Sequence, residues 1–144
     1  MICRIALHSP VAALLLCAAS FGADTPTCPP KIDVHQQLAA PVAGWTALLD
    51  DSPHQLAGIT FYDGTPQEKA SLAYDDITKV AGKQVAKWLF APEGGRPTWI
   101  SCNYSGTSVQ LTKSLPPKTT ACEVKYDPKQ QIAGLPVIEA ISCR

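Results

Sequence analysis

The sequence carries little charge and no cluster of either sign. Its 144 residues include 12 Lys and Arg against 12 Asp and Glu, and charged residues make up 17% of the chain. A nucleic-acid-binding surface is usually a basic stripe, and a helix that lies on a membrane usually has a basic face. The sequence has neither, so it predicts no nucleic-acid partner and no membrane-surface helix.

Motifs of enzyme and metal chemistry are scarce as well. There is no Cys-x-x-Cys pair, no zinc-type spacing and no Gly-x-Ser-x-Gly motif. The best catalytic candidate is the group Asp50, Asp51 and His54, which would serve an envelope hydrolase in acid–base chemistry or metal binding. The intervening Ser52-Pro53 favours an exposed loop instead, since short isolated motifs arise by chance. We therefore expect no catalytic residues, no metal and no cofactor.

Long hydrophobic runs are absent except at the N-terminus. Residues 11–19 (VAALLLCAA) are apolar, and Arg4 is the only charge before Asp24. An apolar core of about 7–15 residues is typical of a secretory signal peptide, whereas a transmembrane helix needs about 20. The sequence predicts a cleaved signal peptide over residues 1–22 and no membrane anchor.

The small residues around Gly22 favour cleavage directly after it, and residues 18–20 are a competing site. Acylation of Cys17 would instead make the protein a lipoprotein, but Leu16 stands where a small residue is normally required. We expect a single mature domain over residues 23–144, located in the periplasm or secreted.

What the mature chain does contain is four cysteines: Cys28, Cys102, Cys122 and Cys143. An even number in an exported domain predicts two disulfides formed in an oxidising compartment. The short separation favours pairing Cys102 with Cys122. In a simple meander, however, these two would lie two strands apart, at about 9–10 Å, and a disulfide needs Cα atoms within about 7 Å. The connectivity stays open.

Thirteen prolines and nine glycines separate short runs of β-branched and aromatic residues. This pattern predicts strands divided by turns, with residues 98–113 forming a hairpin. The expected strands are residues 31–36, 57–62, 84–90, 98–104, 108–113, 122–126 and 136–143. We predict a mainly β fold, a single antiparallel sandwich or partly closed barrel stabilised by disulfides.

Three segments are less regular. Residues 45–49 lie between two prolines, which favours a short strand or a loop. Residues 65–68 resemble a helix start, with Pro66 in the first turn, and such a helix would extend at most to about Leu72. Asp75 and Asp76 indicate a solvated turn.

The chain resembles an uncharacterised family of small secreted proteobacterial proteins with a signal peptide and one cysteine-containing β-rich domain. The residues that carry the resemblance are Cys28-Pro29-Pro30, Ile32, Val34, Gly44-Trp45, residues 61–64, Pro66, Glu68, residues 70–72, residues 99–102, Tyr104, Leu115-Pro116, Cys122, Val124 and Tyr126. The resemblance implies export and a single domain, and it implies no activity.

These patterns favour a non-enzymatic protein-binding module of inhibitor or immunity type with a protein partner in the cell envelope. A cross-linked β scaffold holds its loops still, and loops commonly carry binding function. The expected binding surface joins a turn to a hairpin tip and comprises Phe61, Tyr62, Asp63, Gly64, Trp99, Tyr104, Ser105, Gly106 and Thr107. The alternatives are the envelope hydrolase described above and a structural or stress-related envelope protein without a discrete ligand.

Overall fold

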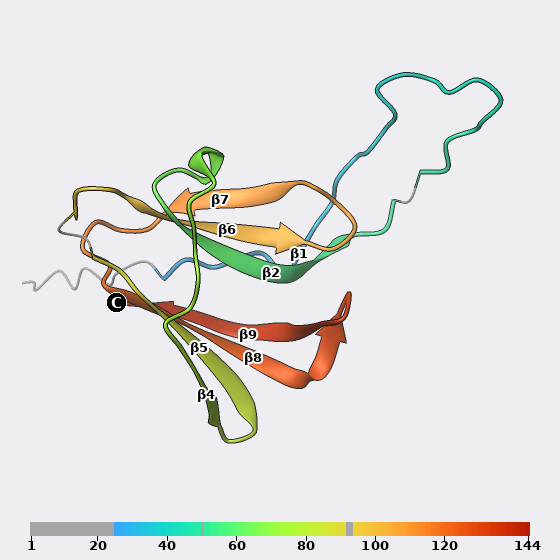
Figure 1. The fold of residues 1–144 in the computed structure, drawn as a ribbon. Coiled ribbons are helices and arrows are strands. Elements are labelled where there is room, and N and C mark those ends of the chain that lie inside the picture. Colours follow the sequence, from blue (N-terminus) through green and yellow to red (C-terminus); the bar gives the residue numbers. More distant parts are fainter. Residues whose placement is uncertain (1–24, 50, 92–93) are drawn as a thin grey trace, which may run out of the picture.

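The computed structural model describes residues 25–49, 51–91 and 94–144, and within these ranges the chain forms nine strands and one 3-10 turn (Figure 1). The predicted signal peptide lies outside the described residues. The elements are β1 (Lys31–Ile32), β2 (His54–Asp63), η1 (Pro66–Glu68), β3 (Ser71–Leu72), β4 (Asp76–Val80), β5 (Lys83–Leu89), β6 (Thr98–Tyr104), β7 (Gln110–Ser114), β8 (Ala121–Ile132) and β9 (Leu135–Cys143).

The strands form two antiparallel sheets that face each other (Figure 1). One sheet has the order β1-β2-β6-β7, with β3 also pairing with β2, and the other has the order β4-β5-β8-β9. The predicted mainly β, antiparallel sandwich is confirmed, and neither sheet closes into a barrel. The predicted hairpin is confirmed too, because β6 and β7 pair from Trp99 with Ser114 to Asn103 with Gln110.

The core lies between the sheets and follows from the alternation of side chains along each strand. Phe61 and Ile100 of the first sheet are direct register partners, and both are almost fully buried. Val124 and Trp88 fill the core from the second sheet. The rings of Phe61 and Trp88 lie 5.0 Å apart at a tilt of 56°, a favourable aromatic geometry. These contacts join the two sheets.

The structure settles the disulfide pairing. Cys28 bonds to Cys102 with their Cα atoms 5.7 Å apart, and Cys122 bonds to Cys143 with Cα atoms 4.1 Å apart. The chain passes from one sheet to the other between β7 and β8, so Cys102 and Cys122 belong to different sheets. The simple meander is therefore not formed. The short pairing of Cys102 with Cys122 is not formed either.

The helix expected from Pro66 and the strand expected over residues 31–36 are both shorter than predicted. The helix expected from Pro66 is a single 3-10 turn, because Lys69 adopts a left-handed conformation (φ 59°) and ends it. Ser71 and Leu72 then pair with β2 as a strand. The expected strand over residues 31–36 contains only two paired residues, Lys31 and Ile32.

Two further strands differ from the prediction. Asp75 and Asp76 were expected to form a solvated turn. Instead, Asp76 begins the edge strand β4, which covers residues 76–80 and pairs with β5. Strand β8 continues past Asp127 to Ile132, because an irregularity in the β8–β9 ladder between Asp127 and Gln131 accommodates Pro128. A proline is tolerated there because a bulge requires no ladder hydrogen bond from its nitrogen.

Candidate functional site

The residues of the expected binding surface lie at opposite ends of the β2–β6 strand pair. Asp63 pairs with Thr98 at one end, and Leu56 pairs with Tyr104 at the other. Seven residues of strand separate the two ends by about 20 Å. The structure therefore presents two surfaces in place of the single patch expected from the sequence.

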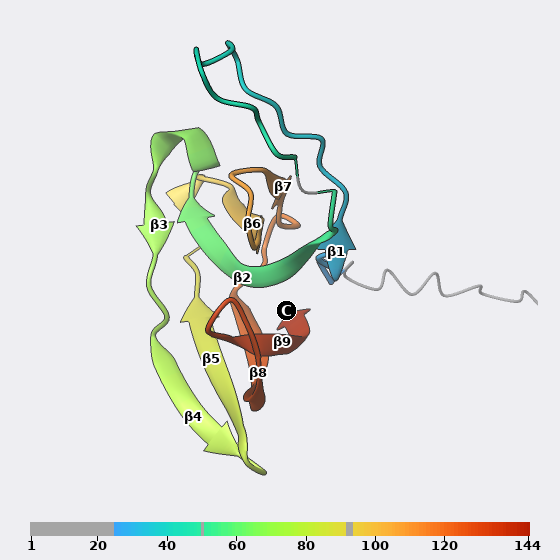
Figure 2. The ribbon, with the colours of Figure 1, turned by 90° about the vertical axis from the view of Figure 1, so that its right-hand side faces the viewer.

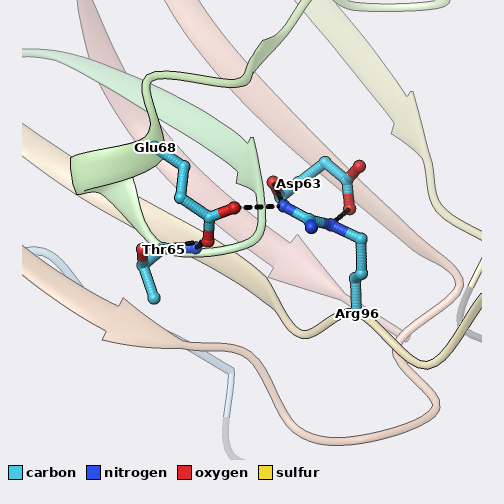
Figure 3. Close-up of polar contacts among 4 residues, drawn as sticks. All are labelled: Asp63, Thr65, Glu68 and Arg96. Carbon is cyan, nitrogen blue, oxygen red and sulfur yellow. Dashed lines mark hydrogen bonds and ion pairs between the residues drawn. The ribbon is translucent and has the colours of Figure 1, made fainter.

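The first surface, the turn after β2, is organised around Arg96 (Figure 3). Its Nη2 donates to Oε2 of Glu68 at 2.6 Å and to the backbone oxygen of Asp63 at 2.9 Å, while Nε donates to Oδ1 of Asp63 at 3.2 Å. Glu68 also accepts from the Thr65 amide at 2.9 Å, which completes a capping box. One guanidinium thus joins the end of β2 to the turn η1.

This geometry sets the ionisation of Glu68. Hydrogen bonds from Arg96, and then from the Thr65 backbone, lower the pKa of Glu68 from 4.5 to about 2. The cluster is half exposed, so its ion pairs are solvated and contribute little to stability. Glycine suits position 64 beside this cluster, since its φ is +92° and an added Cβ would displace Nη2 of Arg96.

The second surface, the end of the β6–β7 hairpin, is held by His54. The Nδ1 atom of His54 lies 2.7 Å from the carbonyl oxygen of Ser105, and Nε2 lies 3.4 Å from Nε2 of Gln36. A carbonyl oxygen only accepts and an amide nitrogen only donates, so these contacts fit the neutral tautomer protonated at Nδ1. Gln36 also donates to the carbonyl of Gly106 at 3.3 Å. His54 thus ties the hairpin to the chain that follows β1.

The group Asp50, Asp51 and His54 is only partly described. Asp50 lies outside the described residues, and Asp51 is exposed as expected for a loop. His54 differs from that expectation, because it begins β2 and its side chain is buried with both ring nitrogens engaged. Across the described ranges, no three His, Cys, Asp or Glu side chains are placed to hold a metal ion.

Several residues of the expected surface have core positions. Phe61 is fully buried, and Tyr104 is buried with its hydroxyl donating to the carbonyl of Pro29 at 3.0 Å. Tyr62 and Trp99 are register partners on the outer face of the first sheet and are half-buried. Asp63, Ser105, Gly106 and Thr107 remain exposed or half-buried. Only part of the set is therefore accessible to a partner.

A second charged cluster lies on the other sheet. Asp127 accepts from Nζ of Lys83 at 2.7 Å, from the Lys129 amide and from the Gln130 side chain. The hydrogen bond from Lys83, followed by that from the Lys129 amide, lowers the pKa of Asp127 from 3.8 to about 2. Lys83 also contacts Glu139, so the cluster joins β5, β8 and β9 and has a structural role.

The most exposed apolar side chains lie in the segment between β1 and β2. Residues 33–49 form a segment without strands between β1 and β2, which we call the projecting loop, and it extends away from both sheets (Figures 1 and 2). Trp45 is 80% exposed and Leu48 is 98% exposed. The sequence signal for this feature was the lack of regular periodicity between the two strands. In contrast, Trp88 belongs to the core.

Fold and surfaces together define a small disulfide-linked β-sandwich that presents loops in the manner of a protein-binding module of inhibitor or immunity type. The chain belongs to the type VI secretion system Tli immunity protein family, whose family model matches residues 51–144. The match covers eight of the nine described strands, from β2 to β9. No curated protein and no solved structure matches the chain. No helix within the described residues is long and apolar enough to cross a membrane.

Proposed function

We propose that the protein is exported to the periplasm, where it binds a toxin delivered by type VI secretion and blocks its action. The observation that carries this proposal is membership of the Tli immunity family over residues 51–144. Neutralisation by an immunity protein is a binding event, so the protein needs a stable scaffold and an accessible surface. It needs no chemistry of its own.

Two features support the compartment. Both disulfides require oxidising conditions to persist, which the bacterial periplasm supplies and the cytosol does not. The N-terminal sequence carries the apolar run and small residues of a signal peptide. A periplasmic immunity protein protects against a toxin that acts on the envelope from that side.

The test is a protection assay in a laboratory bacterial host. Each type VI effector of the bacterium that encodes the protein is expressed with an export signal, alone or with the full chain. As a control, the protein is expressed without residues 1–22. We expect the full chain to abolish the toxicity of one effector, and the form without residues 1–22 to fail. Neutralisation of no effector would overturn the immunity function, and equal protection by both forms would overturn the periplasmic location.

A second measurement separates binding from catalysis. The purified effector, inactivated at its own catalytic residue, should form a stoichiometric complex with the mature protein in size-exclusion chromatography. Protection that saturates at equal amounts of the two proteins is expected for an inhibitor. Protection by trace amounts would instead indicate that the protein acts as an enzyme on the toxin or its product.

A further inference from the structure

We infer that the projecting loop is the element that anchors the toxin, with Trp45 and Leu48 entering an apolar pocket whose rim is basic. This inference rests on the proposed function and adds the surface and the chemistry of the partner. The loop lies outside residues 51–144, so the family match does not itself carry the inference. Three observations on the loop do: its fixed base, its apolar tip and its charge.

The base of the projecting loop is held from several directions. β1 pairs with β2 through Lys31 with Gln55 and Ile32 with His54, directly before the loop begins. The Cys28–Cys102 disulfide and the hydrogen bond from the Tyr104 hydroxyl to Pro29 fix the chain upstream of β1 to β6.

Within the loop, Gln36 contacts His54 and the carbonyl of Gly106. A loop fixed at its base loses less conformational entropy when it binds, so more of the contact energy appears as affinity.

The projecting loop is apolar and solvated, and we call residues 42–48 its tip. Five of the twelve exposed large hydrophobic side chains of the described residues lie within the loop, namely Leu38, Val42, Trp45, Leu48 and Leu49. The turn that presents Trp45 is closed by a hydrogen bond from its amide to the carbonyl of Val42 at 3.1 Å, with Gly44 at φ +79°. These side chains contribute little to folding because they stay in water. An exposed Trp beside Leu side chains is instead a typical binding hot spot.

The charge of the region selects the kind of partner. No Lys or Arg occurs between Lys31 and Lys69, whereas Asp33 lies at the base of the loop directly after β1 and Asp51 follows the loop's other end. An anionic lipid surface attracts basic segments, so a loop without Lys or Arg is unsuited to it. A protein pocket with a basic rim offers both apolar contact and charge complementarity.

The experiment uses the effector that the protection assay identifies, purified and inactivated, with the full mature protein. Affinity is measured for the wild type and for Trp45→Ala, Leu48→Ala and Asp33→Lys. Leu135→Ala is the matched control, since Leu135 is 51% exposed at the β8–β9 turn, away from the loop. Urea midpoints should be unchanged in Trp45→Ala and Leu48→Ala, because neither side chain is packed in the fold.

We expect the two tip variants to weaken the Kd at least about 30-fold, the loss typical of a hot-spot residue, and the control to stay within about threefold. Asp33→Lys should slow association and reduce its salt dependence. Acrylamide should quench Trp45 in the free protein and lose access to it in the complex, with Trp45→Phe as the reference for the other two tryptophans.

The outcomes separate the two proposals. If the wild type binds the effector and both tip variants bind equally well, the loop proposal is overturned while the immunity function stands. If the wild type binds no effector, the proposed function itself fails. Binding to vesicles of phosphatidylglycerol that depends on Trp45, with effector affinity unaffected, would show that the loop contacts lipid and would also overturn the inference.

Discussion

Removing the Cys28–Cys102 disulfide should destabilise the protein more than removing the Cys122–Cys143 disulfide. A disulfide that closes a loop of n residues restricts the unfolded chain by about 2.1 + 1.5R ln n cal/mol/K in the chain-entropy model. The separation of 74 residues gives about 4.5 kcal/mol at 25 °C, and the separation of 21 residues gives about 3.3 kcal/mol. The double variants Cys28→Ala/Cys102→Ala and Cys122→Ala/Cys143→Ala should therefore differ by about 1 kcal/mol.

The native contacts around the two bonds sharpen the comparison. Cys122 and Cys143 are direct register partners in the β8–β9 ladder, which stays hydrogen-bonded without the disulfide. Cys28 lies before β1, where the Leu56 amide donates to the carbonyl of Pro30 at 2.9 Å. Loss of the Cys28 bond should therefore also speed hydrogen exchange at the Leu56 amide, and loss of the Cys122 bond should not.

The assay is urea unfolding of both double variants and the wild type under identical conditions, with the m-value fitted freely because a disulfide changes the compactness of the unfolded chain. Amide exchange at Leu56 is followed by NMR in the same samples. Both variants lose two sulfur atoms, so the small cavity terms largely cancel in the comparison. A larger loss in the Cys122 pair, or unchanged exchange at Leu56 in the Cys28 pair, would refute the reasoning.

Three further predictions concern the charged clusters, the turn and the core. Glu68 and Asp127 have folded-state pKa values of about 2, below the ordinary 4.5 and 3.8, so their contribution is complete above about pH 4.5 and is lost as the pH falls toward 2. Urea midpoints should drop over that window mostly through Asp127, because the Glu68 cluster is half exposed and solvated. Asp127→Asn should therefore flatten the drop more than Glu68→Gln, and an unchanged profile in Asp127→Asn would contradict the assignment. Gly64→Ala should cost about 1–2 kcal/mol in urea unfolding, mainly through its left-handed backbone (φ +92°), because the added Cβ meets the flexible end of Arg96, which can move away. The control Gly82→Ala (φ +78°, no atom within 4 Å of the added Cβ) should cost a similar amount, and a loss at Gly64 more than about 2 kcal/mol above the control would contradict this reasoning. Phe61→Ala should cost about 3–5 kcal/mol, since Phe61 is fully buried against Trp88 and Phe90, and thermal unfolding that matches the wild type would exclude this core role.

Local pattern was sufficient for the strands that bury one face. Within residues 98–104 the stretch from Ile100 to Tyr104 alternates, with Ile100, Cys102 and Tyr104 inward, so the strand was predicted with the bounds that β6 has. The edge strand β4 was missed, because Asp75 and Asp76 were interpreted as a solvated turn and only the pairing with β5 shows that Asp76 begins a strand. The extension of β8 was missed because Pro128 normally ends a strand, and only its partner β9 accommodates the irregularity there.

The site shows the same division. The sequence pointed to residues 61–64 and 104–107 as a turn and a hairpin tip, and the structure places residues 61–63 at the end of β2, Tyr104 at the end of β6 and the remaining residues beyond these strand ends. Which of these side chains is accessible depends on the facing sheet, which buries Phe61 and Tyr104. Arg96 was not singled out, because nothing local to it shows that Glu68, 28 residues earlier, lies within hydrogen-bonding distance.

The sequence by itself determined the presence of two disulfides and a mainly antiparallel β fold, and it predicts an export signal. These depend on composition and on short-range alternation, which a single chain displays directly. Only the tertiary structure decided that the chain changes sheets between β7 and β8, so that Cys28 pairs with Cys102 and Cys122 with Cys143. Only the tertiary structure likewise shows that Trp45 and Leu48 lie outside the core, because the burial of a side chain depends on what the rest of the chain packs against.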